Sequence, residues 1–143
     1  MTPGLVRVCI AVIVIIKCSS ILSAIVCDTG GMRTNSSPGE WPVSYHGTTC
    51  HGAKGIADEG YNMSKGHRFK YGKGIYSAPS IDVAARYAKV FEFNMKSYIV
   101  VFQNRVSTAG LEVISTQETN VGEYWVQPND NLIRPYGLCI KEV

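Results

Sequence analysis

Short apolar runs separated by glycine-rich or polar stretches make up the chain from residue 41 onward. Runs of this length that are rich in Val, Ile and Tyr are typical of β-strands. They predict strands at 43–46, 75–78, 98–102, 111–114, 124–126 and 136–140. Because these strands outnumber the helices and do not alternate regularly with them, the pattern predicts an α+β fold with mainly antiparallel sheets.

Two segments show helical spacing instead. Residues 54–59 carry apolar side chains on one side and charges on the other, and Gly60 is suited to end the helix. Ser80 can cap a second helix, and its apolar face is predicted to comprise Val83, Tyr87, Val90 and Phe91. The stretch 62–73 is polar, basic and interrupted by glycines, which predicts a surface loop.

Residues 1–27 form a hydrophobic segment of another kind. The stretch 8–16 is unbroken apolar and has about the length of a signal-peptide core. Taken through Lys17, the stretch 5–27 is just long enough to span a bilayer, where a central lysine costs roughly 2.5–3.5 kcal/mol. Three interpretations stay open: a signal peptide, a membrane anchor in contact with lipid, or an N-terminal strand or gene-model artefact. The first two place the protein outside the cell or at a membrane, and the third in the cytoplasm.

Composition limits the domain organisation and the kinds of partner and metal site that the chain can have. The stretch 28–40 is rich in Gly, Ser, Thr, Asn and Pro and predicts a linker, which leaves 41–143 as one folded domain. A net charge of +3 without a Lys/Arg stripe argues against a nucleic-acid partner. Cys50 and Cys139 can pair in an oxidising compartment or stay thiols in the cytosol. No Cys/His spacing predicts zinc or another metal, and the adjacent Cys50 and His51 are interpreted as loop residues.

Three motifs place candidate chemistry at strand ends. They are Tyr45-His46-Gly47-Thr48, then the glycine turn and strand 72–78, and finally Gly122-Glu123-Tyr124. Their order resembles the His-Tyr-Glu signature of the poly(ADP-ribose) polymerase-like ADP-ribosyltransferases, over about residues 41–140. The resemblance implies a fold of split, mainly antiparallel sheets and NAD as co-substrate, without a metal.

The resemblance also implies roles for individual residues. His46 donates a hydrogen bond to the adenine-side ribose, and the N–H and C=O of Gly47 hold the nicotinamide carboxamide. Tyr76 and Tyr87 sandwich the nicotinamide ring. The NAD-binding set implied in this way is His46, Gly47, Thr48, Gly74, Tyr76 and Tyr87.

Glu123 is the candidate for bond cleavage. Breaking the nicotinamide–ribose bond develops oxocarbenium-like charge, which a fixed carboxylate stabilises most at the transition state. Glu112 and Glu118 are competitors without the Glu-Tyr context, and an edge-strand charge that limits aggregation is the simpler interpretation of Glu123. The candidate catalytic residues are Glu123, His46 and Tyr76.

Two departures from the family pattern bear on activity. Ala84 stands where the family offers a serine hydroxyl to the carboxamide, and the connection from Tyr87 to Glu123 is short. The short connection favours transfer of single ADP-ribose units, with a protein as the expected acceptor. The alternative is a catalytically silent module of the same fold that binds NAD or ADP-ribose, or that serves only as an interaction module.

A third reading is the tRNA 2′-phosphotransferase branch, which shares the His-Gly-Thr opening. That chemistry needs arginines converging on a phosphate. The arginines of the domain are scattered along the sequence, at Arg68, Arg86, Arg105 and Arg134. This reading ranks last.

Overall fold

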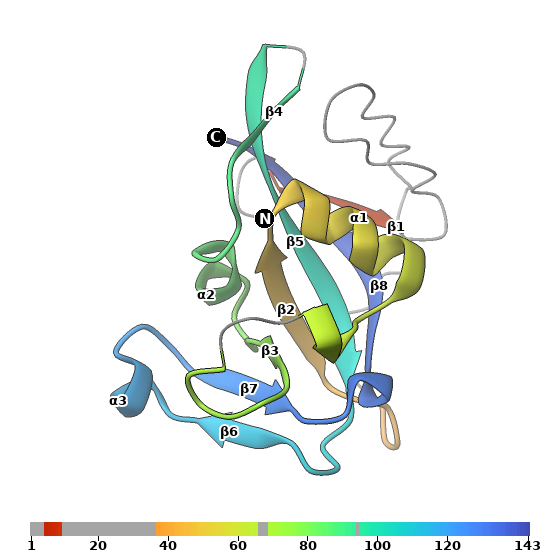
Figure 1. Ribbon diagram of the computed structural model, residues 1–143, viewed down its shortest axis with the longest axis vertical. Coiled ribbons are helices and arrows are strands. Elements are labelled where there is room, and N and C mark those ends of the chain that lie inside the picture. Colours follow the sequence, from red (N-terminus) through yellow and green to blue (C-terminus); the bar gives the residue numbers. More distant parts are fainter. Residues whose placement is uncertain (1–4, 10–36, 66–68, 94) are drawn as a thin grey trace.

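The computed structural model describes residues 5–9, 37–65, 69–93 and 95–143. The chain is α+β, with antiparallel strands in two sheets and a few short helices, so the predicted fold class is confirmed (Figure 1). The larger sheet has the order β1-β8-β5-β2, and β4 also pairs with β5. Its strands are β1 (Leu5–Cys9), β2 (Val43–Thr48), β4 (Phe91–Phe93), β5 (Lys96–Val106) and β8 (Ile133–Glu142).

The smaller sheet has the order β3-β7-β6. It consists of β3 (Ile75–Ser77), β6 (Glu112–Ile114) and β7 (Tyr124–Gln127). The two sheets meet where Tyr45 of β2 and Ala78 exchange both main-chain hydrogen bonds, at 2.7 and 2.9 Å. This bridge brings the His-Gly motif of β2 beside the strand that carries Tyr76.

The longest helix, α1 (Cys50–Glu59), begins where the Thr49 side chain accepts a hydrogen bond from the Gly52 N–H. It ends at Gly60, whose φ of +77° suits a residue without Cβ. The predicted end is therefore correct, but the helix starts earlier than residue 54. Cys50 and His51 lie in its first turn rather than in a loop, because the Thr49 cap lies upstream of the apolar pattern.

The remaining helices are short: α2 (Ile81–Ala85), α3 (Thr116–Thr119), and the 3-10 turns η2 (Met63–Lys65) and η3 (Asp130–Leu132). The prediction for α2 was too long. The Lys89 N–H bonds to the Thr48 carbonyl at 3.2 Å, and Phe91 continues into β4, where its ring lies 5.9 Å from that of Tyr98. Strand pairing with β5 thus overrides the helical spacing of Val90 and Phe91.

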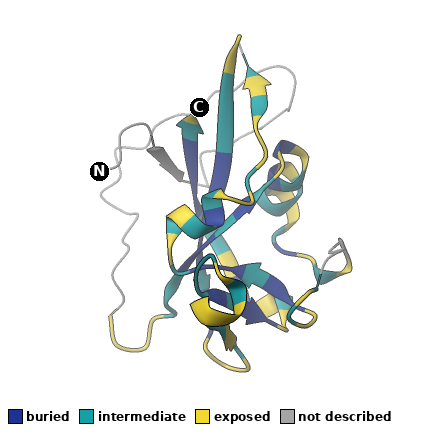
Figure 2. Ribbon diagram, turned by 90° about the vertical axis from the view of Figure 1, so that its left-hand side faces the viewer, coloured by how far each residue is buried: buried dark blue, intermediate teal, exposed yellow. Residues whose placement is uncertain are grey.

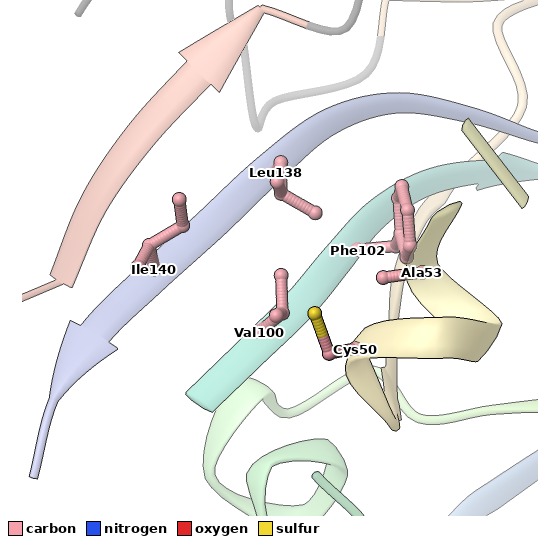
Figure 3. Packing of buried hydrophobic residues seen from close by; sticks show 6 residues of the cluster. All are labelled: Cys50, Ala53, Val100, Phe102, Leu138 and Ile140. Atoms are coloured by element: carbon pink, nitrogen blue, oxygen red, sulfur yellow. The ribbon is translucent and has the colours of Figure 1, made fainter. Parts of the chain in front are cut away.

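The core forms on both faces of β5. Val100 and Phe102 face α1, where they pack with Cys50 and Ala53 and with Leu138 and Ile140 of β8 (Figure 3). Val101, which alternates with them, packs on the opposite face under α2. Figure 2 shows that β5 is exposed where it begins and becomes buried toward its C-terminal end. Each fully buried side chain of this kind contributes about 1.5–3 kcal/mol to stability.

The N-terminal predictions fall mostly outside the described residues, which leave out 1–4 and 10–36. Within them, Leu5–Cys9 form strand β1, paired antiparallel with β8. No helix in the described ranges is long and apolar enough to cross a membrane. Cys50 is disulfide-bonded, whereas Cys139 is a buried thiol, so the two do not pair with each other.

Candidate functional site

Two cavities adjoin where the sheets meet, and His46 and Tyr76 line both of them. We call the first the aromatic cavity. Its volume is about 360 Å³, and its walls carry five tyrosines, Tyr45, Tyr71, Tyr76, Tyr87 and Tyr124. We call the second the helix-side cavity. Its volume is about 700 Å³, and it lies along α1 and the chain that follows it. Both volumes fall in the range of small-molecule sites.

The tyrosines of the aromatic cavity are held by one another and by the backbone. The ring of Tyr124 lies 5.9 Å from that of Tyr71 and 5.7 Å from that of Tyr87, both edge-on. The Tyr76 hydroxyl donates to the Gly72 carbonyl at 2.6 Å and accepts from the Tyr71 N–H at 2.8 Å. The predicted pair of Tyr76 and Tyr87 therefore shares one cavity, whose aromatic walls suit a flat ring.

Gly47 gives this cavity its main-chain polar groups. Tyr45 directs its N–H and C=O to Ala78, away from β5. Main-chain groups of alternate residues in a strand point the same way, so those of Gly47 also point away from β5, into the cavity that Gly47 lines. A Cβ on Gly47 would lie 2.1 Å from the Ala84 carbonyl oxygen. Glycine is thus required here for the contact with α2 as well as for access to the cavity.

His46 joins the two cavities through its ring. Its Nδ1 lies 2.6 Å from the Tyr76 carbonyl oxygen, which can only accept, so Nδ1 carries the proton. Burial lowers the pKa of His46, against a smaller opposing effect of this hydrogen bond. The ring is therefore neutral near pH 7 and leaves Nε2 as an acceptor. A ribose hydroxyl would donate to His46, which is the reverse of the polarity that the resemblance implied.

Tyr61 supports this histidine from the helix-side cavity. Its ring meets that of His46 edge-on at 5.3 Å, and its hydroxyl donates to the Asn104 side chain at 2.6 Å. Burial raises the pKa of Tyr61 well above its ordinary value, although the hydrogen bond to Asn104 acts against this. The tyrosine stays neutral. Its ring packs against the histidine ring, and the Tyr76 carbonyl holds the histidine at Nδ1.

The helix-side cavity is lined by the start of α1 and by the glycine turn before β3. Thr48, Thr49, His51 and Gly52 contribute from the helix end, where the helix dipole favours an anion. The Gly52 N–H at this end already donates to the Thr49 side chain. Gly74 lines the far side, where a Cβ would lie 2.8 Å from the Gln127 carbonyl oxygen. The structure thus brings Thr48 and Gly74, both predicted, to one cavity with His46 and Tyr76.

Glu123 is placed differently. It lies just before β7 and lines neither cavity. One of its carboxylate oxygens, Oε2, accepts a hydrogen bond from the Trp125 indole N–H at 3.0 Å. The next residue, Tyr124, does line the aromatic cavity. Its competitor Glu118 lies in α3, a single helical turn, rather than in a loop.

The other competitor, Glu112, lies closer to Tyr76 in the sheet. Glu112 pairs with Val126, and Val126 pairs with Tyr76, so the three share one face of the small sheet. The Glu112 carboxylate contributes to the raised pKa of Tyr76, after the larger effect of burial. Glu112 is exposed and lines neither cavity.

Three cavity-lining residues were not predicted as site residues from the sequence. Tyr71 and His51 were assigned to loops and Tyr124 to a strand, yet all three line a cavity. The adjacency of Tyr124 to Glu123 was the available signal for one of them. Arg105 and Arg134, considered for phosphate binding, both contact Trp41 and line neither cavity.

No protein-family model and no curated protein sequence matches this chain. Function is therefore inferred from the two cavities and the groups that line them.

Proposed function

We propose that the protein binds NAD across the two cavities and transfers ADP-ribose from it to an acceptor, as single units. The observation that carries the proposal is the shared wall: His46 and Tyr76 line both an aromatic cavity and a larger cavity beside the start of α1. A dinucleotide with one flat cationic ring and one long anionic arm matches this pairing of spaces.

The aromatic cavity supports placement of the nicotinamide end. The ring carries a positive charge in NAD, and tyrosine faces attract a cation by about 0.5–2 kcal/mol. Gly47 offers one N–H donor and one C=O acceptor, which matches the oxygen and the amino group of a carboxamide. Together these groups suit a flat ring that carries an amide.

The helix-side cavity supports placement of the ADP arm. The first turn of α1 favours the diphosphate, because the positive end of the helix dipole stabilises negative charge. The neutral His46 presents Nε2 as an acceptor for a ribose hydroxyl. Tyr61 holds that ring in place.

The reaction needs no metal in this scheme. The bond between ribose C1′ and the nicotinamide nitrogen breaks, and its electron pair goes to the nitrogen, which leaves as neutral nicotinamide. The acceptor nucleophile forms the new bond to C1′ and loses a proton. Glu123 is the proposed stabiliser of the cationic ribose, with the Trp125 indole holding one carboxylate oxygen. The acceptor proposed is a protein side chain.

A second candidate function is binding of NAD or ADP-ribose without turnover. Two observations favour it: the Glu123 carboxylate already has the Trp125 indole as a partner, and Ala84 lines the aromatic cavity with only a methyl group. Both cavities would be kept in such a protein, and the catalytic carboxylate would have a structural role.

The test is release of nicotinamide from NAD by the full chain, alongside NAD binding measured by calorimetry. Glu123→Gln removes the charge while keeping the shape, so it should lower release on the order of 100-fold and leave binding unchanged. Glu112→Gln is the matched control, because it removes an exposed carboxylate from the same small sheet.

The outcomes separate the candidates. NAD binding without release by the wild-type chain would establish the silent module. Loss of release in Glu112→Gln but not in Glu123→Gln would move the catalytic role to Glu112. Absence of binding of both NAD and ADP-ribose would refute both candidates.

A further inference from the structure

Ser77, the last residue of β3, has a buried hydroxyl that nothing above uses. The residue is 6% exposed, and among the described residues its Oγ has no hydrogen-bond partner. Buried hydroxyls are nearly always paired in native proteins, and each exception needs an explanation. A ligand that completes the pairing is one such explanation.

The position of Ser77 points to that ligand. The residue lines the aromatic cavity together with Gly47 and Ala84. Ala84 brings no polar side-chain group to the wall, and the Tyr76 hydroxyl is committed to Gly72 and Tyr71. Ser77 and Gly47 therefore share one cavity wall. The Ser77 Oγ is buried, and rotation about the Cα–Cβ bond changes the direction in which this hydroxyl points.

We propose that the Ser77 hydroxyl hydrogen-bonds the carboxamide of the nicotinamide ring and so acts as a specificity-determining residue. A carboxamide oxygen accepts two hydrogen bonds and its amino group donates two, whereas Gly47 offers only one of each. Ser77 fills one of the remaining positions. Ala84 cannot do so, because its side chain has no hydroxyl. The inference rests on the proposed function, because it takes NAD as the ligand.

Ser44 provides an internal control. It is also fully buried, and its Oγ likewise has no partner among the described residues. Ser44 lies on β2 opposite Asn104 and does not line the aromatic cavity. A general effect of removing a buried hydroxyl would therefore appear in both serine variants, whereas loss of a ligand contact would appear only at Ser77.

The experiment measures binding to the full chain of NAD and of an analogue with pyridine in place of nicotinamide. Ser77→Ala should weaken NAD binding by about 3- to 10-fold, the value of one neutral hydrogen bond. The same change should leave binding of the pyridine analogue unaltered, since that ligand lacks the carboxamide. Ser44→Ala should alter neither affinity. Ser77→Cys, which keeps a side chain of similar size with a weak donor, should behave like Ser77→Ala and serves if the alanine variant does not fold.

Unchanged NAD affinity in both Ser77 variants would overturn the inference. Equal losses for NAD and the pyridine analogue would also overturn it, because they would mean a reshaped cavity. In either case NAD binding by the wild-type chain would leave the proposed function standing. A wild-type chain that binds neither NAD nor ADP-ribose would instead refute the proposed function, and the inference would fall with it.

Discussion

The aromatic and helix-side cavities share two lining residues but differ in volume and in the side chains that line them. The aromatic cavity is the smaller, about 360 Å³ against about 700 Å³, and its walls are large rings packed edge to edge. The helix-side cavity is lined by glycines and polar residues at the start of α1 and around the glycine turn, and also by the larger side chains of Ile56, Tyr61, Phe69 and Ile75. Tyrosine rings dominate the walls of the first cavity, whereas the walls of the second mix small, polar and apolar side chains.

This difference indicates where specificity resides. A fixed aromatic wall with the main-chain groups of Gly47 recognises one kind of ring in one orientation. A wider cavity beside a helix N-terminus attracts negative charge but constrains the shape and orientation of the bound group less. We therefore expect the chain to discriminate at the nicotinamide end and to tolerate variation in the ADP arm.

The largest expected effect comes from adding a methyl group to each cavity. In Gly47→Ala the new Cβ would lie 2.1 Å from a main-chain oxygen of α2, which cannot move without shifting the helix. The unfolding free energy should fall by about 3 kcal/mol, at the upper end for overpacking. Gly55→Ala, in α1 on the helix-side cavity, meets nothing within 4 Å and should gain about 0.5–1 kcal/mol from helix propensity. Denaturant unfolding of both variants measures the contrast.

Equal destabilisation by the two alanines would contradict the comparison. It would mean that the close contact of β2 with α2 is not what shapes the aromatic cavity.

A smaller effect separates the ligands of the two cavities. Tyr87 lines only the aromatic cavity and is 51% exposed, so Tyr87→Ala should leave the fold intact. It should weaken nicotinamide binding about 2- to 10-fold, the value of one aromatic contact with a neutral ring, and leave ADP-ribose binding unchanged. His51 lines only the helix-side cavity, so His51→Ala should weaken ADP-ribose binding roughly 2- to 10-fold and spare nicotinamide. Calorimetric titration of each variant with both ligands gives the four affinities.

A variant in one cavity that weakened binding of the ligand assigned to the other cavity would contradict the assignment of nicotinamide and ADP-ribose to separate cavities. If Tyr87→Ala weakened ADP-ribose binding as strongly as nicotinamide binding, the two cavities would act as one space. If His51→Ala weakened nicotinamide binding, the orientation proposed for NAD would be reversed.

Local sequence patterns were enough to predict the central strand and several of the residues that line the cavities. The apolar runs around Val100 and Phe102 predicted a buried central strand because side-chain burial on both faces needs no knowledge of the partner. His46 and Gly47 were predicted to line the site because a glycine after a histidine at a strand end is a local feature. Gly74 was assigned to the site only through the resemblance to the His-Tyr-Glu family, because a glycine turn before a strand is by itself common.

What the sequence pattern did not predict depends on contacts between distant segments. Tyr124 enters the aromatic cavity because β7 pairs with β3 in one register, and a shift by one residue would turn it away. The second helix ends at Ala85 because the following chain pairs with β5, which lies beyond it in the sequence. The tautomer of His46 follows from a carbonyl thirty residues away, at Tyr76.

The smallest expected effect is a pH dependence at the residue that joins the cavities. Burial lowers the pKa of His46 below its ordinary value of 6.5, so the unfolded chain takes up the proton first as the pH falls. The stability contributed by neutral His46 is complete above pH 6.5 and is lost as the pH falls from there through the lower pKa of the folded state. His46→Gln keeps an amide donor for the Tyr76 carbonyl but does not titrate, so this part of the acid decline should disappear. His51→Gln, which removes an exposed histidine at the start of α1, should retain it. Unfolding free energies between pH 7.5 and pH 4.5 measure the difference, and an identical acid decline in wild type and His46→Gln would show that the junction of the two cavities does not depend on a neutral imidazole.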